Sequence, residues 1–181
     1  MQVSEAIKGR RSIRKFKDTI VDRKVLTAIM EDARFSPSWR NGQIARFTFV
    51  QDDAIIKQLS QEGVYGFAYN AGTLQKAKNI AILSVVQGTS GKLDTPGYAT
   101  SKENAWEMFD AGIACQTFLL SAYNHGIATC VMGVIDDEKI AKIINLPKNE
   151  TVAAMIAFGY ADDTGNPVSR KEISEICRFT D

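Results

Sequence analysis

The apolar residues of this chain recur at helical spacing in some stretches and at strand spacing in others. Residues 46–52 alternate as a half-buried strand does, whereas 79–87 and 151–160 are continuous apolar runs that predict strands buried on both faces. Asp22 precedes a stretch to about residue 35 as an N-cap, and the apolar face of that predicted helix consists of Val25, Leu26, Ile29, Met30 and Ala33. The remaining predicted elements are helices over 3–9, around Ile55–Leu59, over 102–125, over 136–146 and from about 171, a strand over 128–134 and a loop over 36–43.

The predicted helix over 102–125 is the longest element. It contains no proline, and its residues are apolar nearly all round between Ala111 and Ala122. That pattern predicts a helix buried centrally or in a subunit interface. His125, which precedes Gly126, is interpreted as its C-terminal cap and not as a catalytic base.

Strands and helices follow one another without strict alternation, which favours an α+β fold with a central sheet and helices packed on it. We find no internal repeat and no linker, so residues 1–181 are predicted to form one domain. The apolar stretches are too short to span a bilayer, and no N-terminal apolar run resembles a signal peptide.

Composition narrows the classes of function. The chain has 22 Lys and Arg against 21 Asp and Glu, and this near neutrality argues against a nucleic-acid-binding protein. A single histidine excludes a multi-histidine metal site within one chain, and we predict no metal. Three cysteines without a C-x-x-C spacing favour a reducing cytoplasm and structural thiols.

Positive charge is nevertheless gathered near the N-terminus, where residues 10–16 read RRSIRKF. In an extended segment, Arg10, Ser12 and Arg14 would share one face. Two guanidinium groups and a hydroxyl there match the oxygens of a phosphate, because arginine offers a planar fork of donors. A solvated basic face is the alternative, and spacing alone favours it.

Several stretches, in their order along the chain, resemble the nitroreductase family of FMN-dependent oxidoreductases: RRSIRKF, SPSWRNGQ, DAGIACQTFLLSAYNHGIATCVMGV, AFGYAD and NPVSRKEISEI. The resemblance implies a mostly antiparallel sheet flanked by helices, a long central helix, and a homodimer with FMN between its subunits. It further implies that NAD(P)H reduces the flavin and leaves, and that a nitroaromatic, quinone or similar electron-poor substrate then takes its place. Since no Rossmann or P-loop motif is present, NAD(P)H is expected to visit the flavin pocket itself.

The resemblance also implies roles for individual residues. Arg10, Arg11 and Ser12 would bind the FMN phosphate, Arg170 would return to it, and Arg14 would lie near the pyrimidine end of the flavin as electrostatic support. The other subunit would offer the loop with Pro37, Ser38, Trp39 and Asn41. The backbone of Met132 and Gly133 would lie beside the reactive nitrogen, so no side chain is expected to act as a catalytic nucleophile.

Other features leave alternatives open. Trp39 stands where the family has a small residue, and it either narrows the pocket or covers the core. Segments 65–75 and 88–106 are expected near the pocket mouth, where aromatic residues could stack against a substrate. Core or interface packing is nevertheless favoured for Tyr65, Phe67, Tyr69, Trp106 and Phe109. Glu103, Glu107 and Asp110 share a helical face, for which a solvated or interface role is favoured over an acid/base pair.

Two functional alternatives also remain at this point. One keeps the flavin fold with a different reaction, such as heterocycle dehydrogenation, dehalogenation or flavin consumption. The other is a non-enzymatic module that uses the basic segment to bind an anion or a nucleic acid.

Overall fold

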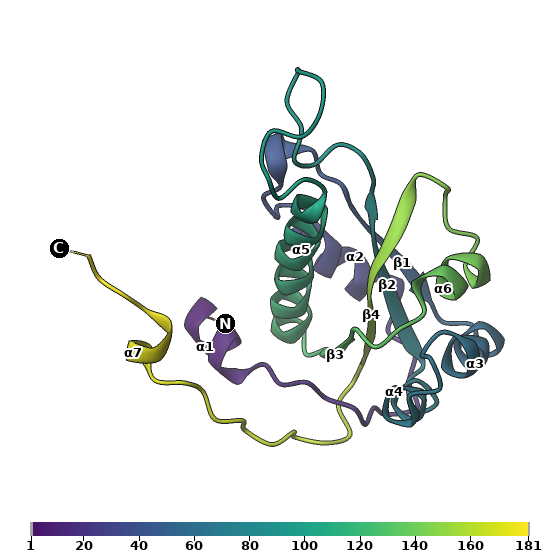
Figure 1. The fold of residues 1–181 in the computed structure, drawn as a ribbon. Coiled ribbons are helices and arrows are strands. Elements are labelled where there is room, and N and C mark those ends of the chain that lie inside the picture. Colours follow the sequence, from purple (N-terminus) through teal and green to yellow (C-terminus); the bar gives the residue numbers. More distant parts are fainter. Residues whose placement is uncertain (1, 181) are drawn as a thin grey trace.

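In the computed structural model, which describes residues 2–180, a four-stranded sheet lies between two layers of helices (Figure 1). The strand order is β1-β2-β4-β3, and every pairing is antiparallel. The strands are β1 (Ala45–Val50), β2 (Asn79–Val86), β3 (Ala128–Met132) and β4 (Glu150–Gly159). This arrangement confirms the predicted α+β class with an antiparallel sheet.

One face of the sheet packs on α2 (Arg23–Ala33) and the long α5 (Ala105–Asn124). Phe118 of α5 is fully buried and lies 5.0 Å from the ring of Phe47 and 6.3 Å from that of Phe158. Aromatic rings at these separations attract one another in addition to the burial of their apolar area. The long helix is therefore anchored at its middle to the centre of the sheet.

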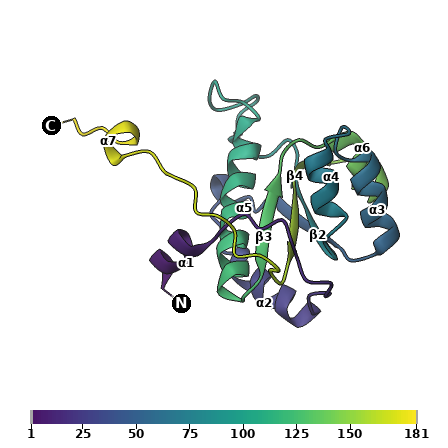
Figure 2. The same ribbon diagram turned by 90° about the horizontal axis from the view of Figure 1, so that it is seen from below.

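The other face is covered by α3 (Asp53–Glu62), α4 (Ala68–Leu74) and α6 (Asp137–Ile143), as Figure 2 shows from below. Successive residues of β2 point to opposite faces, and all but the last are buried. The continuous apolar run of β2 thus reflects a strand covered on both sides, as predicted.

Three helices begin directly after an aspartate that caps their N-terminus. Asp22, Asp52 and Asp136 each accept a backbone N–H of the helix that they precede, so α2, α3 and α6 begin just after them. The long helix starts at residue 105 and not at 102, because the preceding residues form turns and Glu103 has a positive φ of 48°. The strand predicted over 128–134 ends at Met132.

The alternating aromatic residues around 65–69 do not predict helix α4. It has seven residues, no side-chain cap, and a single aromatic residue, Tyr69, whose side chain is exposed. A helix this short is stabilised by tertiary packing and not by its own propensity, so its sequence carries little signal.

Three shorter elements complete the chain: α1 (Val3–Gly9), the 3₁₀ turn η1 (Trp39–Asn41) and α7 (Ile173–Ile176). Between α1 and α2, the basic segment 10–17 runs beside β3, with the Ile13 N–H donating to the Thr129 carbonyl at 3.0 Å. After β4 the chain forms a C-terminal arm, residues 161–180, that extends away from the sheet in both ribbon views.

Candidate functional site

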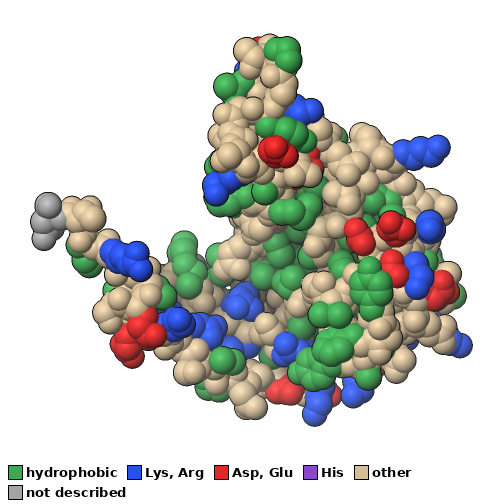
Figure 3. Space-filling view, in the orientation of Figure 1, with side chains coloured by type: hydrophobic (Ala, Val, Ile, Leu, Met, Phe, Trp, Pro, Cys, Tyr) green, Lys and Arg blue, Asp and Glu red, His purple; other side chains and the backbone are tan. Residues whose placement is uncertain are grey.

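A pocket of about 570 Å³ opens between the basic segment, α4 and the base of the C-terminal arm; we call it the basic pocket. Figure 3 shows Lys and Arg side chains gathered where the arm meets the rest of the molecule. The cations that line the pocket outnumber its one carboxylate, Asp163, and they are Arg10, Arg11, Arg14, Lys15, Lys76 and Arg170. This excess of positive charge favours an anionic ligand.

Backbone contacts bring the two distant ends of the chain together here. Lys17 donates its N–H to the Tyr160 carbonyl at 2.9 Å, and Asp162 donates to the Lys15 carbonyl at 3.0 Å. Further along the arm, Gly165 lies so close to Ile13 that an added Cβ would be 2.8 Å from its side chain. The arm therefore follows the basic segment, and this path delivers Arg170 to the same pocket as Arg10.

The donors of the pocket differ in how they are satisfied. Arg11 donates to the carbonyl oxygens of Lys8 and Arg10, at 2.6 and 2.9 Å, and Arg14 donates to that of Ser12 at 3.2 Å. The Nε of Arg10, in contrast, is buried and has no hydrogen-bond partner within residues 2–180. A buried donor without an acceptor costs about 1–3 kcal/mol, so this atom fits a ligand that brings an oxygen. The residues present thus fit a phosphate group.

Met132 and Gly133, at the end of β3, do not line the basic pocket. Met132 is the last residue of β3, the strand that pairs with the basic segment, and Gly133 follows it. Met132 is buried, whereas Gly133 is exposed. A Cβ added at Gly133 would meet no atom within 4 Å. The backbone at this position therefore faces open space, as a close approach to a planar ring requires.

The loop of residues 36–43 lies elsewhere. Pro37 and Ser38 line a separate pocket of about 420 Å³ against α5, which shares no residue with the basic pocket, and Trp39 and Asn41 line neither. Within one chain, the structure therefore brings Arg10, Arg11, Ser12, Arg14 and Arg170 together and leaves the 36–43 loop apart.

Trp39 contacts neither the sheet core nor the basic pocket. Its ring is tilted by 50° to that of Trp106, with the ring centroids 4.9 Å apart, and its indole N–H donates to the Lys92 carbonyl at 2.7 Å. Trp39 therefore does not cover the sheet core, and its narrowing of a flavin pocket stays a prediction. The contact with Lys92 depends on a loop that is more than fifty residues away along the chain.

Two of the alternatives that the sequence leaves open are wrong. Glu107 and Asp110 are 4% and 3% exposed and accept hydrogen bonds from loop residues, so they do not form a solvated face, and an interface role for that face stays a prediction. Tyr65, Phe67 and Tyr69 are 65%, 43% and 58% exposed, so they do not pack in the core of their own chain, and interface packing stays a prediction. Tyr69 lines the basic pocket, and the Arg14 guanidinium lies 5.2 Å from its ring centroid.

Two arginines of the basic pocket also affect the pKa values of two buried thiols. Burial raises the pKa of Cys115 to about 11, and the charge of Arg10 opposes that shift. Burial likewise raises the pKa of Cys130, against the opposing charges of Arg14 and Arg10. Both thiols are therefore neutral at physiological pH, which agrees with a structural role.

Sequence reasoning missed the contributions of Lys15 and Lys76 to the basic pocket, whereas Tyr69 lies in the segment 65–75 that was expected near the pocket mouth. Lys15 belongs to the basic segment, so its position there is the signal that could have found it. Lys76 follows α4, which the sequence pattern does not predict. Within residues 2–180 we find no cluster of His, Cys, Asp or Glu suited to a metal ion, and no helix there is long and apolar enough to cross a membrane.

Comparison with known proteins defines the class to which this fold and pocket belong. The sequence model of the nitroreductase family matches residues 7–160. A Methanothermobacter thermautotrophicus protein, whose name carries both NADH dehydrogenase and NAD(P)H nitroreductase, is 28% identical over 94% of this chain and 82% of its own length. Nitroreductase NfnB of Mycolicibacterium smegmatis is 26% identical over 96% of this chain and 91% of its own.

Among solved structures, a nitroreductase family protein from Clostridium novyi NT superposes with a TM-score of 0.79 at 26% identity, covering 91% of this chain and 87% of its own. The chain belongs to the nitroreductase family. The resemblance seen in the sequence is confirmed, and with it the expected class of FMN-dependent NAD(P)H oxidoreductase.

Proposed function

We propose that this protein holds FMN with its phosphate in the basic pocket, takes reducing equivalents from NAD(P)H, and reduces nitroaromatic, quinone or similar electron-poor substrates. The observation that carries this proposal is the buried, unpartnered Nε of Arg10 at the wall of a pocket lined by six cations. Phosphate oxygens supply both the missing acceptor and the compensating negative charge. Arg11, Ser12 and Arg170 complete the proposed phosphate site.

When bound, FMN supplies the hydride chemistry, so the residues of the chain act by position and charge. Arg14 lines the basic pocket beside the Tyr69 ring. A fixed cation at this position would stabilise negative charge on the neighbouring flavin ring. The backbone of Met132 and Gly133 is the proposed contact for the reactive edge of the flavin, because a Cβ added at Gly133 would face open space.

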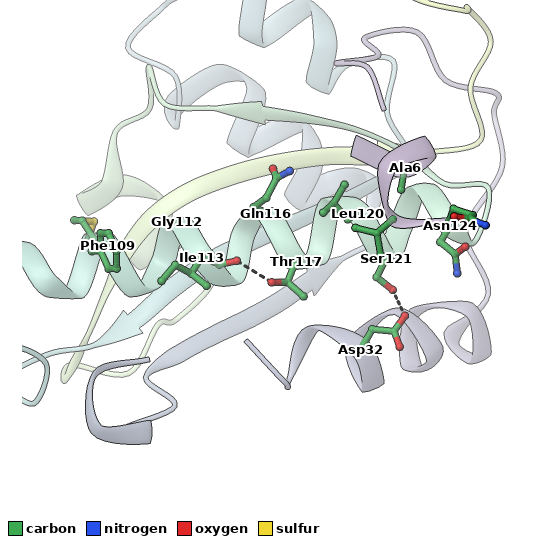
Figure 4. Close-up of a pocket in the computed structure, with 13 residues that line it drawn as sticks. Ala6, Asp32, Phe109, Gly112, Ile113, Gln116, Thr117, Leu120, Ser121 and Asn124 are labelled. Atoms are coloured by element: carbon green, nitrogen blue, oxygen red, sulfur yellow. Dashed lines mark hydrogen bonds between the residues drawn. The ribbon is translucent and has the colours of Figure 1, made fainter. Parts of the chain in front are cut away.

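The proposed site is completed by a second copy of the chain. Pro37, Ser38, Trp39 and Asn41 lie outside the basic pocket of their own chain, and we propose that they contact the flavin held by the partner subunit. A large apolar hollow of about 840 Å³ runs along α5, where Figure 4 shows Gly112, Ile113, Gln116 and Leu120 on one side of the helix. The C-terminal arm adds further exposed apolar residues, namely Ile173, Ile176 and Phe179.

These surfaces support a homodimer in which α5 of one copy packs against the other and the arms reach across. Ile113→Glu would place a charge in the hollow, and we expect a monomer that retains no FMN. Ile20→Glu adds the same charge at an exposed position outside that hollow and should leave the dimer intact. Sedimentation of both variants tests this point, and a dimeric Ile113→Glu protein would overturn the interface.

NAD(P)H and the electron-poor substrate are proposed to occupy one site in turn, which predicts ping-pong kinetics. We also propose a cytoplasmic location. The three cysteines are free thiols, as a reducing compartment maintains them, and the cytoplasm supplies NAD(P)H.

The first test is the visible absorption spectrum of the freshly purified protein, before and after anaerobic addition of NADH or NADPH. We expect a yellow protein that bleaches with at least one nucleotide and regains its colour when a nitroaromatic or quinone is added. A protein that stays colourless when FMN is offered would refute the proposed cofactor site. A yellow protein that neither nucleotide bleaches would refute the proposed electron donor.

A further inference from the structure

The loop of residues 36–43 is connected to a second loop, residues 88–104, which we call the finger. The indole N–H of Trp39 donates to the Lys92 carbonyl, and Arg40 forms two hydrogen bonds to Asp94, at 3.0 and 3.1 Å. The finger projects beyond the N-terminal end of α5 (Figure 1). Any displacement of the 36–43 loop would therefore move the finger as well.

The centre of this connection is the carboxylate of Asp110 in α5. It accepts the backbone N–H of Trp39, at 3.1 Å to each oxygen, and the hydroxyl of Ser90, at 2.8 Å. Asp110 is 3% exposed and forms no ion pair with any residue from 2 to 180. Burying a carboxylate without a cation is costly, and here the only compensation comes from the two loops.

The Arg40–Asp94 pair cannot carry the connection alone. Its side chains are 51% and 90% exposed, although hydrogen bonding to Arg40 lowers the pKa of Asp94. Exposed ion pairs of this kind contribute little and are screened by salt. The hydrogen bonds of Asp110 are buried and their donors are uncharged, so salt does not screen them as it screens the exposed pair. They therefore determine whether the two loops stay together.

The backbone of the 36–43 loop makes this anchor necessary. Arg40, Asn41 and Gln43 have positive φ values of 48°, 55° and 48°, a conformation that side-chain-bearing residues adopt at a cost and that persists only when the surroundings enforce it. Asp110 binds the N–H of Trp39, immediately before this strained stretch. It therefore restrains the part of the loop that precedes Asn41.

The finger is packed at its base, where Ser90 and Gly91 are buried, whereas residues 93–104 are exposed. Gly91 has a φ of 82°, and an added Cβ would collide with the Glu103 carbonyl and lie 3.0 Å from the Trp106 ring. Glu107, one turn before Asp110, accepts the Gly88 N–H at 2.6 Å. Glu107 thus anchors only the base of the finger, whereas Asp110 joins the finger to the 36–43 loop.

We propose that Asp110 is a positioning residue for the flavin site: by binding Trp39 and Ser90 at once, it makes the 36–43 loop and the finger one rigid wall of the site in the partner subunit. The proposal rests on the proposed function, because it takes the 36–43 loop as a flavin contact. Flavin affinity and access of the electron-poor substrate are then set together by one buried carboxylate.

Of the two tryptophans of the chain, Trp39 belongs to this wall and Trp106 of α5 contacts it, so intrinsic fluorescence reports on the wall directly. The test compares Asp110→Asn with Glu107→Gln, a matched loss of one buried charge on the same helix. For each protein, the emission maximum is measured without FMN, and FMN affinity is measured by quenching of the tryptophan emission. Substrate KM and the rate of flavin reduction are measured at saturating FMN.

We expect Asp110→Asn to shift the tryptophan emission to longer wavelength, weaken FMN binding about tenfold and raise substrate KM, with an unchanged rate of flavin reduction. Glu107→Gln should keep the FMN affinity of the wild type within about twofold. If Asp110→Asn retains the wild-type emission and FMN affinity, or if both variants weaken FMN equally, the proposal is overturned.

If Asp110→Asn does not fold, Ser90→Ala provides the second measurement, because it removes only the finger's bond to Asp110. Hydrogen exchange of residues 88–104 should then become faster while FMN affinity stays unchanged, and an unaltered exchange rate would overturn the link. A wild-type protein that shows no quenching by FMN would refute the proposed function, whereas the emission and exchange results still decide whether Asp110 joins the loops.

Discussion

Replacing Arg10 by alanine removes the one buried guanidinium nitrogen of the basic pocket that lacks a partner. If that nitrogen binds the FMN phosphate, the variant loses a hydrogen bond to a charged group, which is worth about 1.5–3 kcal/mol. A change of this size corresponds to about a tenfold to a hundredfold loss of FMN affinity. The alanine variant also relieves the cost of the buried unpaired donor, so the protein without FMN should not be destabilised.

The assay is titration with FMN and, separately, with riboflavin, which has the same ring system and no phosphate. Arg10→Ala should weaken FMN binding and leave riboflavin binding unchanged. Lys17→Ala is the matched control, because Lys17 lies in the same segment but does not line the basic pocket. Equal FMN affinities for Arg10→Ala and the wild type, or an equal loss for FMN and riboflavin, would show that the phosphate is bound elsewhere.

Three further predictions concern the free energy of unfolding, its dependence on pH and the proteolysis of the finger. Phe118→Ala should lower the free energy of unfolding by about 3–5 kcal/mol, because it leaves a cavity among the core aromatic rings; urea denaturation measures this, and a loss below about 1 kcal/mol would contradict the packing. Burial raises the pKa of Cys115 to about 11 from its ordinary value of 9.0, so the unfolded state loses this proton first. The free energy of unfolding should therefore fall as the pH rises from about 9 to about 11, and the fall should be smaller in Cys115→Ala. Gly91→Ala should loosen the finger, because the added Cβ collides with the Glu103 carbonyl; faster proteolysis within residues 88–104 measures this, and unchanged cleavage would argue against that contact.

Much of the fold could be predicted because its signals are local. The apolar run of β2, which is covered on both faces, the N-cap Asp22 and the long apolar α5 follow from patterns within a few neighbouring residues. The cations of the basic segment were equally visible. In each case one stretch of chain carries the whole pattern, so no knowledge of distant contacts was needed.

Where partners are distant, prediction from the chain failed. The pattern favours a solvated or interface face for Glu107 and Asp110, and the solvated alternative is wrong because they are buried by loops that begin about twenty and seventy residues earlier. The role of Trp39 depends on Trp106, and the exposure of Tyr69 depends on the packing of the unpredicted α4. Burial is a property of the assembled fold, and a carboxylate carries the same local pattern in either setting.

The sequence by itself determined the kinds of element, their order, the family and the gathering of positive charge in residues 10–17, because periodicity, capping and motif are properties of neighbouring residues. Only the tertiary structure decided that Asp110 joins the 36–43 loop to the finger. It also brings Arg170 to the pocket of Arg10 and leaves the 36–43 loop apart from them, which the sequence implied only through its resemblance to the family. These are relations between segments far apart in the chain. They arise when the apolar faces of the sheet and helices pack together, since that packing alone sets which polar groups meet.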